Sequence, residues 1–339
     1  MVTISLCMIV KNEERVLARC LDSVRGLVDE MIIVDTGSTD ATKEIAARYT
    51  DKIYDFTWIN DFSAARNFAF SKASCEYIYT ADADEVIDEE NREKFLQLKA
   101  VLLPEIEIVQ MYYGNQLSFG TIYNFDKELR PKLFKRLRQF EWVEPIHETI
   151  RLEPVIFDSD ITITHLPEQS HTARDLAAFQ RQIINGKGLS ARLRQIYAKE
   201  LFVSGQDADF LAAEAYFTEL ADSGTLTEDQ FREAVCVIVK AASVRGDVHK
   251  FYRYAMKDVA AGAVSEVCHE LGNYYFALGL YEEAAMWYYN AAYETSSILS
   301  IRTSGDLPLL GLSACYEKLG ADELACEYAL KAKEWKAEE

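Results

Sequence analysis

Continuous apolar runs alternate with amphipathic segments along the first hundred residues of the chain. Uninterrupted apolar and β-branched residues predict buried strands, whereas apolar positions three and four residues apart predict helices. The expected strands are residues 3–10, 31–34, 52–56 and 76–80. The expected helices are residues 13–24, a segment capped by Thr39 or Asp40 and ending near Tyr49, residues 62–72 and residues 89–103. Repeated strand–helix units with continuous apolar strands predict an α/β domain with a mostly parallel sheet covered on both faces.

The pattern changes after this region, because the next strands follow one another without helices between them. The expected strands are residues 105–113, 132–137, 140–143 and 160–164. We therefore expect mixed or antiparallel pairing to close the sheet. Residues 166–170, which include Pro167, break the pattern, and everything beyond them is helical. The sequence thus predicts two domains, residues 1–170 and 171–339.

The helical half repeats itself. Alignment on four glycines gives spacings of 41, 33 and 41 residues between Gly205, Gly246, Gly279 and Gly320. The clearest unit, residues 265–296, matches the tetratricopeptide pattern, in which small residues let two antiparallel helices pack closely. Its characteristic positions are Leu271, Gly272, Tyr275, Gly279, Ala284, Tyr288 and Ala291. A second unit begins near Asp306, and the two units before residue 265 follow the pattern more weakly, so we expect an all-α repeat domain.

Charge and composition exclude several classes of function. The 339 residues carry a formal net charge of −19, and acid exceeds base in both predicted domains. This balance argues against a nucleic-acid-binding surface or wide docking to an anionic membrane. No apolar run approaches the ~18 residues of a membrane helix, and the short N-terminal run is typical of a strand rather than a secretory signal. The seven cysteines are scattered without a C-x-x-C pair, which favours a cytoplasmic protein without a zinc site.

Candidate chemistry begins at Asp82-Ala83-Asp84. These residues follow an apolar strand and so lie at the carboxyl edge of the sheet, where open α/β sheets bind ligands. The chain lacks both G-x-G-x-x-G and the P-loop pattern, so a bound nucleotide would need another way to neutralise its phosphates. A divalent metal held by one or two carboxylates is the usual alternative. One carboxylate can then reach the metal while the other reaches a ribose.

A second candidate is Asp35-Thr36-Gly37-Ser38, which also matches the aspartic protease signature. Those enzymes need two carboxylates that share a proton, whereas this motif occurs once and lies between a strand and a helix. The protease interpretation is therefore rejected. A purely structural role for Asp35 and Ser38, as a helix cap and turn, is compatible with a binding role.

Residues 1 to about 170 resemble the family 2 glycosyltransferases, which have the GT-A fold. The resemblance rests on four elements in order, Met8-Ile9-Val10-Lys11-Asn12-Glu13-Glu14, residues 33–42, Ala65-Arg66-Asn67 and Asp82-Ala83-Asp84. The whole chain resembles the branch with C-terminal tetratricopeptide repeats, which includes bacterial peptide S-glycosyltransferases and relatives of lipopolysaccharide-core glucosyltransferases. The resemblance implies metal-dependent, inverting transfer of a sugar from a nucleotide-diphosphate donor, most often a UDP-sugar, to a peptide, protein or glycan.

The resemblance also implies a donor site. Asp35 would accept a hydrogen bond from the nucleobase, and Arg66 would lie near the same base. The nucleoside would be lined by Val10, Lys11, Asn12, Glu13 and Glu14. Asp82 would contact the ribose or a Mn²⁺ or Mg²⁺ ion, and Asp84 the ion itself. The alternatives are a surface ion pair for Arg66 and an ordinary helix first turn for the two glutamates.

Two later segments would complete such a site. His165 ends a predicted strand, where related enzymes often place a further metal ligand; the alternative is an ordinary strand end. Residues 142–148 resemble the W-x-x-x-x-H-E segment on the acceptor side. An inverting transfer needs a base for the acceptor proton, and Glu148 and His147 are the first candidates, followed by Glu144.

A basic stretch and the repeats leave two questions open. Residues 127–138, which include Phe134-Lys135-Arg136, hold six basic residues and one acid. This stretch is either a charged strand edge or a basic arm near the diphosphate or acceptor. The repeats would bind the acceptor or form a homodimer, because stacked helix pairs make a concave surface. The alternative function is an interaction scaffold with a degenerate nucleotide-sugar-binding domain.

Overall fold

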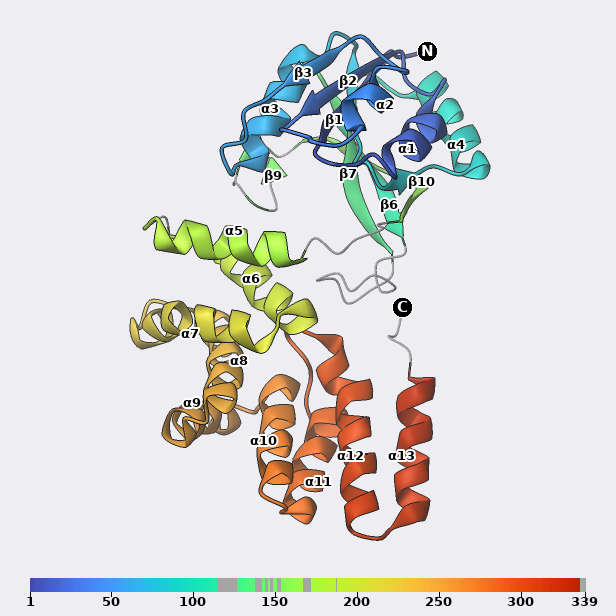
Figure 1. The fold of residues 1–339 in the computed structure, drawn as a ribbon. Helices are drawn as coiled ribbons and strands as arrows, with labels where there is room; N and C mark the ends of the chain where they lie inside the picture. The colour runs from blue at the N-terminus through green and yellow to red at the C-terminus, as the bar shows by residue number, and fades with distance from the viewer. Residues whose placement is uncertain are drawn as a thin grey trace. The chain divides into compact units, whose positions relative to one another are not determined.

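The chain forms two compact units (Figure 1). The computed structural model describes residues 1–114, 127–137, 142–143, 146, 149–150, 154–166, 172–186 and 188–335. The N-terminal unit holds the described residues up to 166, and the C-terminal unit holds those from 172 onward. All seven cysteines are free thiols. Among the described residues, no helix combines the length and apolarity needed to traverse a bilayer.

The N-terminal unit is built on an eight-stranded sheet with the strand order β3-β2-β1-β4-β7-β6-β10-β5. Its strands are β1 (Ile4–Val10), β2 (Glu30–Asp35), β3 (Ile53–Asp55), β4 (Tyr77–Thr80), β5 (Glu85–Val86), β6 (Ile108–Gly114), β7 (Glu128–Lys135) and β10 (Ile156–His165). A separate ribbon pairs β8 (Trp142–Val143) with β9 (Thr149–Ile150). The helices are α1 (Leu17–Val24), α2 (Thr42–Ala46), α3 (Phe62–Lys72) and α4 (Glu89–Val101).

Strand direction decides which ends meet at the candidate site. Strands β1 to β4 are parallel to one another, and β6 is parallel to β10. Strand β7 is antiparallel to both β4 and β6, so β6 runs in the same direction as β4. The carboxyl ends of β1, β2, β4, β6 and β10 therefore share one edge of the sheet with the amino end of β7. This mixed α/β sheet confirms the fold class expected for a GT-A domain.

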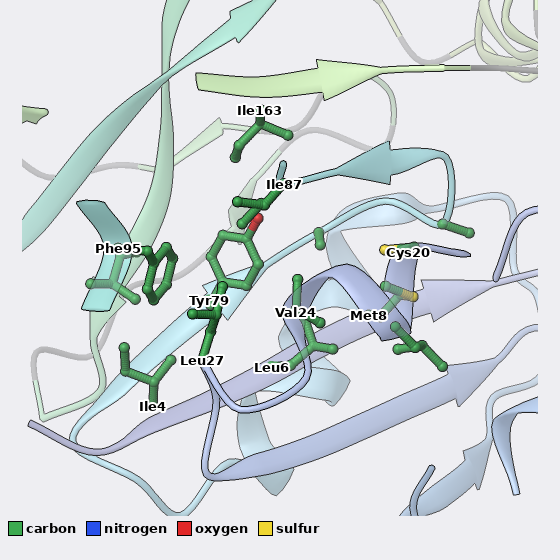
Figure 2. Close-up of a cluster of buried hydrophobic side chains, with 14 of the residues drawn as sticks. Ile4, Leu6, Met8, Cys20, Val24, Leu27, Tyr79, Ile87, Phe95 and Ile163 are labelled. Atoms are coloured by element: carbon green, nitrogen blue, oxygen red, sulfur yellow. The ribbon is translucent and has the colours of Figure 1, made fainter. Parts of the chain in front are cut away.

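Alternation along β1 divides the apolar core into two layers. Ile4, Leu6 and Met8 pack on one face, in a cluster that includes residues of α1, α4, β6 and β10. Figure 2 shows the ring of Tyr79 standing in this cluster, where its centroid lies 5.4 Å from that of Phe95. The opposite face, with Cys7 of β1, packs against α3. Both faces are covered, as the uninterrupted apolar strands predict.

Two helices are shorter than their sequence patterns predict. Helix α1 begins at Leu17 instead of Glu13, and α2 ends at Ala46 instead of near Tyr49. Helix α1 begins late because Asn12 has a left-handed backbone, with φ of 56°, and because the backbone N–H groups after it bond to side chains instead of starting a helix. The N–H of Glu13 donates to the side chain of Thr42 at the start of α2, and that of Glu14 donates to Asp40 in the loop before it, so the chain leaves β1 as a loop.

The C-terminal unit is helical throughout its described length. Its α-helices are α5 (Thr172–Ile184), α6 (Ala191–Ser204), α7 (Asp207–Asp222), α8 (Glu228–Arg245), α9 (Val248–Ala260), α10 (Ser265–Ala277), α11 (Tyr281–Tyr289), α12 (Asp306–Lys318) and α13 (Asp322–Glu334). A π-helical turn, Asn290–Glu294, follows α11, and a 3₁₀ turn, Ile301–Ser304, precedes α12. The last four helices lie side by side in Figure 1.

The four aligned glycines each occupy the turn between two successive helices. Gly246, Gly279 and Gly320 have φ between 74° and 77°, a left-handed conformation that favours glycine. Gly205 differs, because its φ is −68° and an added Cβ would lie 2.6 Å from the carbonyl oxygen of Leu201. Glycine is therefore required at the first turn by close approach and at the other three by backbone conformation.

Small residues also allow close packing around Tyr288 of α11. A Cβ added at Gly272 of α10 or at Gly311 of α12 would lie 2.6 or 2.7 Å from the Tyr288 ring. The ring therefore packs against bare backbone on both neighbouring helices. This is the small-and-large complementarity of tetratricopeptide-like repeats, and it agrees with the sequence pattern of residues 265–296.

Candidate donor and metal site

Asp35 ends β2 at the carboxyl edge of the sheet. Its side chain is buried, and Oδ1 accepts hydrogen bonds from the backbone N–H groups of Gly37 (2.9 Å) and Ser38 (3.0 Å). Its other oxygen, Oδ2, is also buried and has no hydrogen-bond partner among the described residues. One oxygen thus makes the turn that the structural alternative predicts, and the second remains as an acceptor. A buried acceptor of this kind needs an explanation, because most are paired.

The loop after β1 is tied to the loop after β2. The backbone N–H of Asn12 donates to Oγ of Ser38 (2.9 Å), and its side-chain oxygen accepts from the N–H of Thr39 (2.8 Å). Oε2 of Glu14 accepts from the N–H of Ala41 (3.0 Å), and the carbonyl of Val10 accepts from the N–H of Thr36. These contacts give Asn12, Glu14 and Val10 a definite structural task, which is to hold the turn that positions Asp35. Their contact with a nucleoside stays a prediction.

Arg66 lies on α3, and its side chain is largely buried near the carboxyl end of β4. Its side chain is only 11% exposed, Nη1 donates to Oγ1 of Thr80 (3.3 Å), and Nη2 lies 3.8 Å from Oδ1 of Asp82. The helix begins at the cap Asp61, whose carboxylate accepts from the N–H of Ala64, and Ala65 beside Arg66 is fully buried. The burial excludes the alternative of an exposed surface ion pair for Arg66.

Asp84 and His165 are brought together by a strand that the sequence pattern does not reveal. Strand β5 pairs with the end of β10, with Glu85 opposite His165. As a result, Nε2 of His165 lies 3.0 Å from Oδ2 of Asp84, and both side chains are largely buried. Two of the three predicted metal ligands are therefore adjacent.

Asp82 stands apart from this pair. Its side chain is half exposed, and the described residues contain no group of three or more His, Cys, Asp or Glu side chains arranged to hold a metal. Desolvation raises the pKa of Asp82, but the positive charges of Arg66, Lys132, His165 and Arg130 outweigh that effect and lower the pKa below its usual value. Asp82 thus lies where several cationic side chains converge.

Lys132 of β7 and Glu85 of β5 form a buried ion pair, which the sequence-based predictions do not include. Nζ of Lys132 on β7 lies 2.5 Å from Oε1 of Glu85, and both side chains are almost fully buried. Burial raises the pKa of Glu85 to about 7; the Lys132 charge opposes this rise, and Asp82 and Asp84 add to it. No short-range sequence signal could reveal the pair, because 47 residues separate its members.

Basic residues within 127–137 lie at two opposite edges of the sheet. Nζ of Lys135 donates to the carbonyl of Pro104, and Nε of Arg136 donates to the carbonyl of Cys75, just before β4 begins. These two residues therefore lie at the edge opposite Asp84, where they fit the charged strand edge rather than a basic arm near the diphosphate. The earlier residues Arg130 and Lys132 are the ones that reach the candidate site.

The candidate acceptor bases Glu148, His147 and Glu144 lie outside the described residues. Trp142, at the start of the same segment, pairs with Ile150 in the β8–β9 ribbon. The assignment of a base therefore stays a prediction from the sequence resemblance.

Comparison with known proteins agrees with the geometry of the N-terminal unit. Residues 5–151 match the model of the family described as glycosyl transferase family 2. Over 102 residues, the chain is 39% identical to the SPbeta prophage-derived glycosyltransferase SunS of Bacillus subtilis, a match covering 30% of this chain and 24% of that protein. Over 85 residues, it is 49% identical to a TPR repeat-containing protein of Synechococcus elongatus, covering 25% of this chain and 21% of that protein.

Among solved structures, the chain is similar to glucosyl-3-phosphoglycerate synthase from Mycobacterium tuberculosis, crystallised with Mn²⁺ and UDP-glucose. That match has a TM-score of 0.40 and 14% identity, and it covers 54% of this chain and 77% of the other. The chain spans about a quarter or less of the length of the two curated relatives named above. The family match spans strands β1 to β9 and includes Asp35, Arg66, Asp82 and Asp84, whereas β10 and His165 lie beyond it, so the N-terminal unit contains a domain that matches the family 2 glycosyltransferases.

Proposed function

We propose that this chain is an inverting glycosyltransferase that uses a nucleotide-diphosphate sugar, specifically a UDP-sugar, and a divalent cation. The acceptor is a peptide, a protein or a glycan. The proposal rests on the family of the N-terminal domain and on the side chains at the carboxyl edge of its sheet.

The observation that carries the proposal is the buried Oδ2 of Asp35. A buried acceptor left without a partner costs about 1–3 kcal/mol, so a ligand N–H that meets it gains that much in binding free energy. The N3–H of uracil, flanked by two carbonyl groups, is such a donor. Because Oδ1 is held by two backbone N–H groups, Oδ2 is fixed in position before any ligand arrives.

Asp84 and His165 fit a divalent cation that also binds the diphosphate. Such a cation takes one or two protein carboxylates and fills its other positions with phosphate oxygens and water. Imidazole is an acceptable further ligand for Mn²⁺. With Nε2 and Oδ2 only 3.0 Å apart, the two side chains can exchange their mutual hydrogen bond for bonds to one ion. When bound, the cation would stabilise the charge that develops on the leaving diphosphate.

The remaining roles follow the sequence resemblance. Arg66 and Asp82 would bind the nucleoside, Glu148 or His147 would accept the acceptor proton, and the helical repeats would bind the acceptor or form a homodimer. The resemblance alone supports these finer assignments.

Thermal unfolding with nucleotides tests the proposal. UDP with MnCl₂ should raise the unfolding temperature, because a ligand that binds only the folded state stabilises it. UDP with EDTA should give a much smaller shift, and ADP with MnCl₂ serves as the matched control for base recognition. If no nucleotide stabilises the chain with either Mn²⁺ or Mg²⁺, the proposal fails and the scaffold alternative is favoured.

A further inference from the structure

Arg130 is held in a defined position at the edge of the sheet. It lies on β7, opposite Met111 of β6, and its guanidinium carbon is 3.9 Å from the centroid of the Tyr113 ring. Its Nε donates to the carboxylate of Glu128 on the same strand. A guanidinium that stacks on a buried ring and is anchored by a carboxylate loses little further freedom when it binds a ligand.

The same tyrosine ring connects Arg130 to the candidate metal ligands. The Tyr113 ring is buried, and its centroid lies 5.2 Å from that of the His165 ring. Nζ of Lys132 lies 5.1 Å from the Tyr113 centroid. Arg130 is therefore one aromatic ring away from the histidine that contacts Asp84.

The charge pattern around this edge suits an anion. The chain carries a net charge of −19, which repels phosphates, so an anionic ligand needs locally concentrated positive charge. Nη2 of Arg66 on α3 lies 3.8 Å from Oδ1 of Asp82, and Arg130 and Lys132 of β7 both approach the Tyr113 ring. Lys132 already neutralises the buried Glu85, and Arg66 bonds Thr80. Of the two residues at the Tyr113 ring, Arg130 lies closer, with its guanidinium carbon 3.9 Å from the ring centroid against 5.1 Å for Nζ of Lys132.

We propose that Arg130 binds the diphosphate of the nucleotide donor and that Tyr113 positions it for that contact. This inference rests on the proposed function, because it names a residue for the donor site. A guanidinium presents parallel N–H donors that match phosphate oxygens, and such charge-assisted contacts are about twice as strong as neutral hydrogen bonds. Arg130 thereby adds a fixed positive charge beside the one that a cation at Asp84 would supply.

Calorimetric binding of UDP and of uridine, both with MnCl₂, tests the inference. The variant is Arg130→Gln, and the matched control is Arg136→Gln, which removes the same charge at the opposite edge of the sheet. In Arg130→Gln, we expect UDP to bind about tenfold more weakly or worse, since a lost charge-assisted hydrogen bond has that effect, while uridine binding stays within twofold. The control should leave both affinities unchanged.

Several outcomes would overturn the inference. Unchanged UDP affinity in Arg130→Gln would mean that Arg130 does not touch the diphosphate. Equal weakening of UDP and uridine would mean that Arg130 only supports the fold. A second variant, Tyr113→Leu, should also weaken UDP more than uridine, whereas Tyr113→Phe, which keeps the ring, should not. If the unsubstituted chain binds neither ligand, the proposed function itself fails, and the inference falls with it.

Discussion

Nε2 of His165 lies 3.0 Å from Oδ2 of Asp84, although 81 residues separate the two in the chain. The contact exists because the two-residue strand β5 pairs with the last residues of β10. The N–H of Leu166 also donates to the carbonyl of Asp84 (3.0 Å), so backbone and side chains fix the same arrangement. This pairing is the structural basis for treating the two residues as one site.

Replacing His165 with Gln should weaken metal binding without unfolding the domain. The expected effect is at least a tenfold rise in the MnCl₂ concentration needed for UDP to stabilise the chain, since losing a ligand or its immediate support typically costs about 10–100-fold in metal affinity. The measurement is thermal unfolding at saturating UDP with MnCl₂ titrated. His249→Gln, an exposed histidine on α9, is the control. An unchanged titration in His165→Gln would remove His165 from the metal site.

Replacing Asp35 with Asn tests base recognition. Asn can keep the oxygen that accepts from Gly37 and Ser38, but its NH₂ then occupies the position of the unpaired oxygen. A donor there faces the donor of the base, so UDP affinity should fall about tenfold or more while the unfolding temperature changes little. Asp51→Asn, an exposed carboxylate, provides the control in the same calorimetric titration. UDP affinity equal to that of the unsubstituted chain would contradict the role assigned to Asp35.

Replacing Gly272 with Ala should destabilise the repeats. Gly→Ala in a helix ordinarily stabilises by up to about 1 kcal/mol. Here the new Cβ would lie 2.6 Å from the Tyr288 ring, and overpacking of this kind typically costs about 1–3 kcal/mol. The measurement is urea unfolding of the intact chain. Adding Tyr288→Leu should recover part of the free energy of unfolding that Gly272→Ala removes. If Gly272→Ala alone stabilises the chain, the close packing of Gly272 on the Tyr288 ring is wrong.

The pH dependence of stability has a predictable component from Glu200 on α6. Burial raises the pKa of Glu200 to about 8 from 4.5, and the charge of Asp175 adds to the effect. A raised pKa means that the folded state holds the proton more tightly than the unfolded chain. The protonated Glu200 therefore contributes to the free energy of unfolding. That contribution is fully present below pH 4.5 and is lost as pH rises toward 8.

Glu200→Gln removes that dependence. The free energy of unfolding of the variant, minus that of the unsubstituted chain, should rise from pH 5 to pH 9. The expected rise is on the order of a few kcal/mol. Urea unfolding of both proteins at the two pH values measures the difference. An equal difference in stability at pH 5 and pH 9 would show that Glu200 titrates normally.

Regular elements were predictable from the sequence where local pattern decides them. Helix α3 occupies the residues expected for it, 62–72, because Asp61 supplies a cap and the segment contains the strong helix former alanine at positions 64, 65 and 69. The continuous apolar runs of β1, β2 and β4 identified buried strands for the same reason. The four aligned glycines marked helix turns, three because a left-handed turn favours glycine and Gly205 because its backbone approaches Leu201 closely.

Long-range relationships at the site were not predictable in the same way. Strand β5 has two residues and exists only because β10 pairs with it. The ion pair of Lys132 with Glu85 and the stacking of Arg130 on Tyr113 join distant segments, and no residue spacing encodes them. The basic stretch was recognised as unusual, but only strand direction shows that Arg130 and Arg136 lie at opposite edges.

The most direct test of the account is metal-dependent hydrolysis of UDP-sugars by the full chain and by Asp84→Asn. We predict that the unsubstituted chain releases UDP from at least one UDP-sugar when MnCl₂ is present. Asp84→Asn should abolish that release while keeping its unfolding temperature, and Asp158→Asn, an exposed carboxylate on β10, should retain it. Near-normal turnover by Asp84→Asn would contradict the account, because the cation that it places at Asp84 would then have no part in the reaction.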